Sequence, residues 1–172
     1  MKNKKMFRLV PYGLSAVFCI VLTCTALWSV GAGAATQMPD FALENVRDGK
    51  IVQSKSFAGK VLLLSFFATW CPPCVEEVPA LVKLQKDLSA AGFSVIGLSV
   101  DQQGPAPVAK FIEKKGINYP VLLAVEQTTV DFGGVYGIPV SFLVNKSGNV
   151  VKRYAGSVDH DIVEKDIRSL LN

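Results

Sequence analysis

Apolar residues in the middle of the chain occur in short continuous runs, separated by longer stretches with helical spacing. The run Val61–Phe67 is almost wholly apolar, which is typical of a strand covered on both faces of a sheet. Further strands are predicted at Phe93–Val100 and Val121–Val125. Helices are predicted between these strands, over residues 75–91 with a glycine as the stop, and from Pro105 or Pro107 to Lys115 with Gly116 as the stop.

Hairpins are predicted on both sides of this region. Phe41–Asn45 and Lys50–Gln53 are expected to pair through Asp48-Gly49, and Val140–Asn145 and Val150–Tyr154 through the polar residues 146–149. A helical turn is expected around 128–132, and an amphipathic helix over about 159–171 with a buried face of Ile162, Val163, Ile167, Leu170 and Leu171. These elements predict an α/β fold, a mixed central sheet flanked by helices, with an N-terminal β-hairpin extension.

The first 34 residues have the pattern of an export signal. Basic residues cluster before position 9, no charged residue occurs from Leu9 to Pro39, and Leu14–Val30 is almost wholly apolar. Ala32-Gly33-Ala34 then supplies small residues of the kind that precede signal cleavage. We expect residues 1–34 to be a cleaved signal peptide or, because the apolar stretch is long, a retained N-terminal membrane anchor. In both cases residues 35–172 form one domain on the periplasmic or extracytoplasmic face of the membrane.

The basic excess of the chain belongs to this N-terminal segment. The chain has 18 basic and 14 acidic residues, a net charge of +4, and four of the basic residues precede the apolar stretch. The remainder is balanced in charge, so we expect no nucleic-acid partner.

The cysteines carry the candidate chemistry. Cys19 and Cys24 lie in the apolar segment, which leaves Cys71 and Cys74 between the predicted strand 61–67 and the helix that follows it. A helix N-terminus stabilises a thiolate, and a spacing of three residues places the two sulfur atoms close enough to bond. A structural zinc site would need four ligands, and His160 is the one histidine of the chain. We therefore expect a redox-active disulfide, with no metal and no cofactor.

Two neighbours of the cysteines are further candidates. Glu77 follows Cys74 by three residues on the same helix face, where a partly buried carboxyl could exchange a proton with the thiol. The alternative for Glu77 is an acid that simply favours the helix N-terminus. Glu76 points elsewhere and is expected in solvent. Trp70 is expected to form a surface platform for substrate, and the alternative is a core residue.

Three motifs occur in a fixed order along the chain. They are Phe66–Cys74, with the sequence FFATWCPPC; Glu77-Val78-Pro79; and Tyr136–Val144, followed by the turn at 145–150. Together they resemble the thioredoxin fold, and more closely the TlpA/ResA-like branch of exported thiol-disulfide oxidoreductases. The resemblance covers about residues 38–171.

The resemblance implies roles for the matching residues. Cys71 would be the exposed attacking thiolate, and Cys74 the resolving thiol that breaks the mixed disulfide. Pro139 would be a cis-proline that, with Ile138, forms a loop facing the cysteines and pairing with the substrate backbone. Pro79 would kink the helix.

One position departs from cytosolic thioredoxins. These proteins carry a buried aspartate six residues before the first cysteine, where this chain has Ser65. The TlpA/ResA-like branch has instead a glutamate three residues after the second cysteine, and Glu77 matches it.

The expected function is that of an exported thiol-disulfide oxidoreductase acting on protein thiols and disulfides. The resemblance implies a reductant supplied by a membrane electron donor, with cytochrome c maturation as a typical task, and we expect a monomer. A disulfide-inserting oxidant remains an alternative. A peroxiredoxin-like peroxidase would need a threonine three residues before the reactive cysteine, where this chain has Ala68. A binding module without activity is opposed by the intact cysteine pair and its proline loop.

Overall fold

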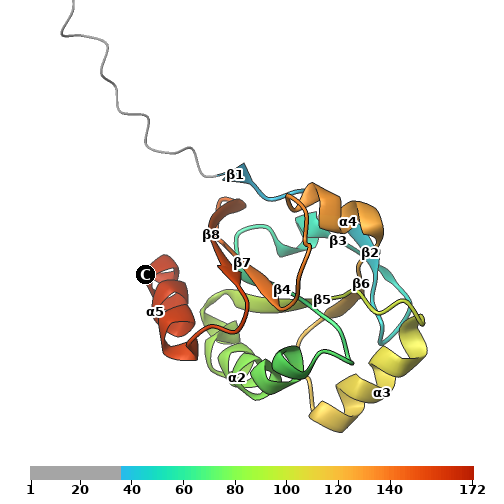
Figure 1. The fold of residues 1–172 in the computed structure, drawn as a ribbon. Helices are drawn as coiled ribbons and strands as arrows, with labels where there is room; N and C mark the ends of the chain where they lie inside the picture. The colour runs from blue at the N-terminus through green and yellow to red at the C-terminus, as the bar shows by residue number, and fades with distance from the viewer. Residues whose placement is uncertain (1–35) are drawn as a thin grey trace, which may run out of the picture. The chain divides into compact units, whose positions relative to one another are not determined.

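Strands β1, β8, β7, β4, β5 and β6 lie side by side, in that order, in one sheet (Figure 1). The computed structural model describes residues 36–172, so the predicted signal peptide or anchor over 1–34 lies outside the described residues. The strands are Thr36–Gln37 (β1), Val61–Phe67 (β4), Phe93–Ser99 (β5), Val121–Leu123 (β6), Val140–Val144 (β7) and Asn149–Ala155 (β8). The predicted central strand is confirmed at its bounds, and the other predicted strands differ by one or two residues at their ends.

The sheet is mixed, as the sequence predicts. β4 runs parallel to β5, which runs parallel to β6, whereas β7 is antiparallel to both β4 and β8. A separate antiparallel pair, β2 (Ala42–Glu44) and β3 (Ile51–Gln53), confirms the N-terminal hairpin. β1 is not predicted, because its two exposed residues carry no hydrophobic pattern, yet it pairs with the start of β8.

The helices are Pro72–Leu88 (α2), Pro105–Lys115 (α3), Glu126–Asp131 (α4) and His160–Leu171 (α5), with short 3-10 turns at Ser54–Phe57 (η2) and Ser89–Ala91 (η3). α2 begins three residues before the predicted start. Proline fits the first turn of a helix, because backbone N–H groups there have no acceptor within the helix. The helix continues through Pro79. Within residues 36–172, no helix combines the length and apolar character that a bilayer-spanning segment needs.

Each face of the sheet is covered by different elements (Figure 1). Alternate residues of β4 point to opposite faces, so Leu63 and Phe67 pack with α2, α3 and α5. Leu64 and Phe66 pack on the other face, with the hairpin, η2 and α4. Every residue of β4 and β5 is consequently buried, which explains their nearly continuous apolar sequences.

The prediction that Ile162 belongs to the buried face of α5 is wrong. Ile162 of α5 is exposed, whereas Val163 and Ile167 are buried against the sheet. The apolar stripe of this helix is therefore narrower than predicted, and Ile162 lies to one side of it.

Candidate redox site

The two cysteines lie at the junction between β4 and α2. Cys71 is the N-cap residue of α2 and Cys74 lies in its first turn, with their Cα atoms 5.3 Å apart and their sulfur atoms bonded. The predicted disulfide is therefore present. The expectation that Cys71 is exposed is wrong for this oxidised form, because both cysteines are only 3% exposed and pack against the core.

A proline loop covers the disulfide from the side of β7. The Ile138–Pro139 peptide bond is cis, as the resemblance implies. The Sγ atom of Cys71 lies 3.9 Å from the carbonyl oxygen of Ile138, so the loop that ends in Pro139 is in contact with the redox pair. Because β7 is the neighbour of β4, the start of β7 and the end of β4 lie at the same edge of the sheet.

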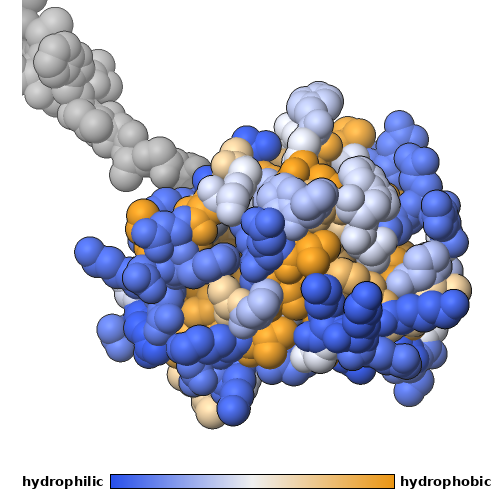
Figure 2. Space-filling view, turned by 60° about the horizontal axis from the view of Figure 1, so that its bottom comes forward, coloured by the Kyte–Doolittle hydropathy of each residue, from blue (hydrophilic) through white to orange (hydrophobic). Residues whose placement is uncertain are grey.

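Trp70 is a surface residue. Its side chain is 67% exposed immediately before Cys71, which excludes the alternative of a core residue. Figure 2 presents the end of the molecule that lies at the bottom of Figure 1, where α2 begins, and hydrophobic residues form a band across it between hydrophilic flanks. A platform role for Trp70 stays a prediction.

Glu77 is a buried acid behind the disulfide. Its side chain lies one helical turn beyond Cys74 and is 7% exposed, whereas the neighbouring Glu76 faces solvent, as predicted. Burial raises the pKa of Glu77 from 4.5 to about 7, and the backbone N–H of Val158 opposes this rise by donating to the carboxylate. A carboxyl with such a pKa can both accept and release a proton near neutral pH.

A small cavity of about 20 Å³ adjoins Glu77. Its wall includes Ser141 of β7, Tyr154 of β8 and His160 of α5, together with Val158. This volume suffices for a single water molecule with polar partners. His160 is half-buried and lines this cavity, a position that its polar neighbours in the sequence do not indicate.

The loop before the disulfide is fixed by an aspartate that the sequence does not mark. The carboxylate of Asp101 accepts hydrogen bonds from the backbone N–H of Thr69, at 3.0 Å, and from its hydroxyl, at 2.6 Å. The hydroxyl of Ser99 donates to the same carboxylate. Phe67 and Ser99 are opposite each other in the parallel pair β4–β5, so the residues after each strand necessarily meet. The sequence alone does not indicate this contact, because only the register of β4 against β5 places Asp101 beside Thr69.

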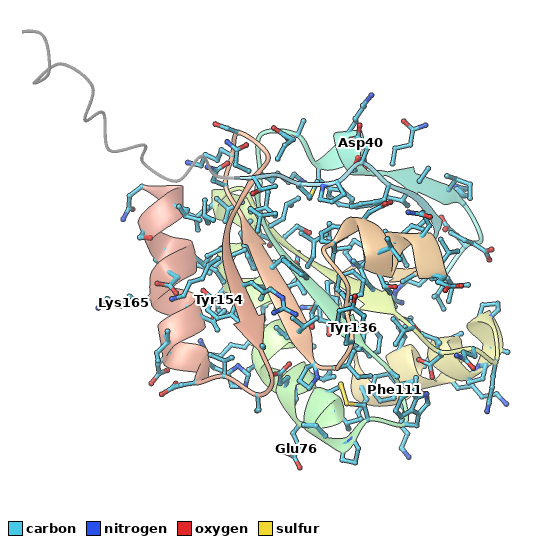
Figure 3. All side chains as sticks on the ribbon, turned by 45° about the horizontal axis from the view of Figure 1, so that its top comes forward. Asp40, Glu76, Phe111, Tyr136, Tyr154 and Lys165 are labelled. Carbon is cyan, nitrogen blue, oxygen red and sulfur yellow. A yellow bond between two sulfur atoms is a disulfide. The ribbon has the colours of Figure 1, made fainter. Side chains whose placement is uncertain are left out.

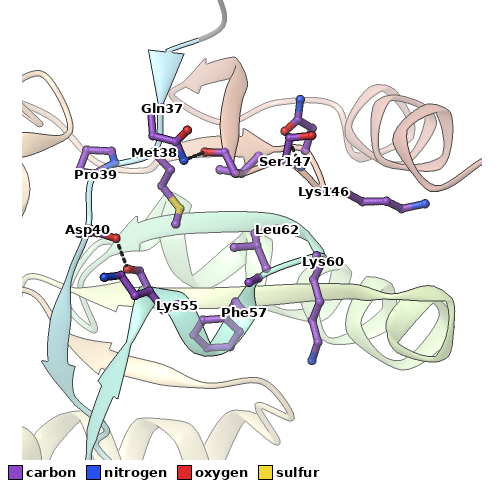
Figure 4. Close-up of a pocket in the computed structure, with 16 residues that line it drawn as sticks. Gln37, Met38, Pro39, Asp40, Lys55, Phe57, Lys60, Leu62, Lys146 and Ser147 are labelled. Atoms are coloured by element: carbon purple, nitrogen blue, oxygen red, sulfur yellow. Dashed lines mark hydrogen bonds between the residues drawn. The ribbon is translucent and has the colours of Figure 1, made fainter.

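A large pocket lies far from this chemistry. It has a volume of about 620 Å³ and lies beside Leu62 at the start of β4, whereas the disulfide follows the end of that strand (Figure 4). Ser54 donates to Asp40 in its wall. Across residues 36–172, no group of three or more histidine, cysteine or acidic side chains is arranged to hold a metal ion.

Known proteins share both the sequence pattern and this fold. Residues 33–171 match the Redoxin family. The thiol-disulfide oxidoreductase ResA of Bacillus subtilis is 29% identical to this chain, over 94% of this chain and 91% of its own length. ResA of Bacillus thuringiensis (strain Al Hakam) is 30% identical, over 78% of this chain and 76% of its own length.

A solved structure is also similar to this chain. A thiol:disulfide interchange protein of the thioredoxin family from Chlorobium tepidum TLS superposes with a TM-score of 0.73 and 35% identity, covering 80% of this chain and 97% of that one. The thioredoxin fold that the motifs implied is thereby confirmed.

Proposed function

Because the chain belongs to the Redoxin family, among the thiol-disulfide oxidoreductases related to ResA, we propose that it reduces disulfides of exported proteins. One observation carries the proposal: Cys71 and Cys74 form a disulfide at the start of α2, in contact with the Ile138–Pro139 loop. Glu77, whose pKa burial raises to about 7, lies one helical turn beyond Cys74. These parts supply a nucleophile, a resolving thiol, a substrate-binding loop and a proton acceptor.

In the reduced protein the thiolate of Cys71 begins the reaction. The N-terminus of α2 stabilises its negative charge, and the thiolate attacks one sulfur of the substrate disulfide. A mixed disulfide forms, and the other substrate sulfur leaves as a thiolate that takes a proton from water. The Cys74 thiolate then attacks the Cys71 sulfur, and the second substrate sulfur leaves. Two electrons pass to the substrate, and the Cys71–Cys74 disulfide remains.

Glu77 is proposed as the acceptor of the Cys74 proton. Cys74 is too buried to lose its proton directly to bulk water, so a base within the helix face is needed. Glu77 lies on that face, and its pKa of about 7 leaves a substantial fraction ionised at neutral pH. When an electron donor later reduces the disulfide, the neutral carboxyl can return a proton to Cys74.

The substrate is proposed to lie over Ile138, Pro139 and Trp70. The Ile138 carbonyl already touches Cys71, so an extended substrate strand alongside this loop would bring its own cysteine to the same sulfur. Trp70 offers an exposed ring beside the cysteine that starts the reaction.

The N-terminal sequence supports a setting outside the cytoplasm. Residues 1–34 support export to the periplasmic or extracytoplasmic face, as a cleaved signal or an anchor. A reductant outside the cytoplasm needs an electron donor in the membrane, and apocytochrome c with oxidised cysteines is the substrate we propose. Protein thiols and disulfides are the partners, and the protein acts as a monomer.

Trapping and direction of transfer test the proposal together. The reduced protein is mixed with an oxidised Cys-x-x-Cys-His peptide, and the products are identified by mass spectrometry after acid quenching. We expect reduced peptide and oxidised protein, with a stable mixed disulfide for Cys74→Ala and none for Cys71→Ala. Oxidation of a dithiol peptide by the disulfide form, with no reaction in the other direction, would identify an oxidant instead.

A further inference from the structure

The exposed aromatic side chains of the described residues gather at the redox site. Among the large hydrophobic side chains that are exposed within residues 36–172, the aromatic ones are Trp70, at 67%, and Tyr136, at 95%. Trp70 directly precedes Cys71. Tyr136 precedes Ile138 by two residues, so their Cα atoms lie within about 8 Å of each other. The Ile138 carbonyl oxygen lies 3.9 Å from the Cys71 sulfur, so the two exposed aromatic residues belong to the two loops that meet at the disulfide.

The Tyr136 ring lies close to a glycine of the same loop. A Cβ atom added to Gly134 would lie 2.6 Å from carbons of the Tyr136 ring and 2.7 Å from its hydroxyl oxygen, so the ring occupies the space that a larger residue at position 134 would need. Gly134 also has a φ of +80°, a conformation that other residues rarely adopt. The tip of the ring thus lies beside Gly134, while nearly all of the Tyr136 side chain is open to solvent and available to a substrate. Figure 3 shows Tyr136 on the loop above the disulfide.

We propose that Tyr136, together with Trp70, selects substrates in which an aromatic or aliphatic side chain lies next to the reactive cysteine. The proposal rests on the proposed function, because it concerns the same disulfide. Cys71 is only 3% exposed and is covered by the Ile138–Pro139 loop. A substrate cysteine that reaches Cys71 must therefore pass this loop, and Tyr136 and Trp70 are the exposed aromatic residues that the loop and the segment before Cys71 offer to its neighbours.

The expected size of the selection follows from aromatic contacts. An aromatic pair in contact strengthens association by about threefold to tenfold beyond the simple burial of area. Tyrosine and tryptophan also predominate among the residues that contribute most at protein interfaces. Because the contact is made with the flanking side chain, the reaction with a small disulfide without such a side chain is independent of Tyr136.

The test compares two oxidised peptides of equal length and charge, one with leucine and tryptophan beside its cysteines and one with serines. We expect the intact protein to reduce the first with a kcat/KM about threefold to tenfold higher. Tyr136→Ser should abolish this preference, and Tyr136→Phe should retain it. Val151→Ser removes an exposed apolar side chain from β8 and serves as the matched control that behaves like the unaltered protein.

Hydroxyethyl disulfide separates this proposal from the proposed function. Equal reduction of it by the intact protein and Tyr136→Ser, with the peptide preference lost only in the variant, supports the selection. A peptide preference that survives in Tyr136→Ser, or an equal loss with both peptides, would overturn it while leaving the proposed function intact. Failure of the intact protein to reduce any disulfide would overturn both.

Gly134→Ala tests the position of the Tyr136 ring without removing the Tyr136 side chain. The added Cβ occupies the place of the Tyr136 ring, so the ring must move away. We expect the peptide preference to fall as in Tyr136→Ser while the reduction of hydroxyethyl disulfide persists. An unchanged preference in this variant, with Tyr136→Ser still defective, would show that the position of the ring on Gly134 is irrelevant.

Discussion

Replacing Glu77 with glutamine should remove a pH dependence of stability that the buried carboxyl causes. The pKa of Glu77 is about 7 in the folded protein, against 4.5 for an unperturbed glutamate carboxyl, so the fold favours the neutral form. The stabilisation of this neutral form is complete below pH 4.5. It is lost as the pH rises through 7, because the unfolded chain ionises first and ionisation then favours unfolding.

The magnitude follows from the difference between the two pKa values. One pKa unit corresponds to 1.36 kcal/mol, so the free energy of unfolding should fall by about 2 kcal/mol between pH 4 and 6. The total loss should approach about 3 kcal/mol at pH 8. Glutamine has similar shape and cannot ionise, so this part of the pH dependence disappears in Glu77→Gln.

The assay is urea unfolding of the oxidised protein at several pH values from 4 to 8. The informative quantity is the difference in unfolding free energy between the unaltered protein and Glu77→Gln, because all other ionisations cancel in it. Glu76→Gln, on the exposed side of the same turn, is the matched control and should follow the unaltered protein. A difference for Glu77→Gln that stays constant with pH would refute the reasoning.

Three further substitutions have defined expectations, each measured by chemical denaturation. Asp101→Ala should destabilise the protein by about 2 kcal/mol, because the N–H and hydroxyl of Thr69 lose a charged acceptor; equal stability would show that the loop has other support. Phe66→Ala should cost about 3–5 kcal/mol, because Phe66 is fully buried with its ring centroid 5.3 Å from that of Phe132; a loss below 1 kcal/mol would contradict this packing. Tyr154→Phe should cost about 1 kcal/mol and raise the pKa of Asp166, which loses one of the hydrogen bonds that lower it; NMR titration of the Asp166 carboxyl checks the direction (Tyr154 is labelled in Figure 3).

The chemistry of the site was predictable because it is local in sequence. Cys71, Cys74 and Glu77 follow one another on one strand–helix junction, and apolar runs on both sides define that junction. Pro139 is distant in sequence, and its place opposite the cysteines came from the family resemblance rather than from any pattern in the residues.

Features made by contacts between distant segments were not predictable. Asp101 meets Thr69 only because β4 and β5 lie side by side, and His160 lines the cavity at Glu77 only because α5 returns to the same face of the sheet. The strand β1 depends on the edge that β8 offers. In each case the sequence offers only one or two polar residues, and such residues occur at many exposed positions without a defined partner.

The midpoint potential of the Cys71–Cys74 pair tests the central claim most directly. It is measured by equilibrating the purified protein against a series of dithiol buffers of known potential. A protein that reduces disulfides with electrons from the membrane should have a value near that of thioredoxin, about −250 mV or lower. A value near about −120 mV would make it an oxidant that inserts disulfides, and would contradict the account.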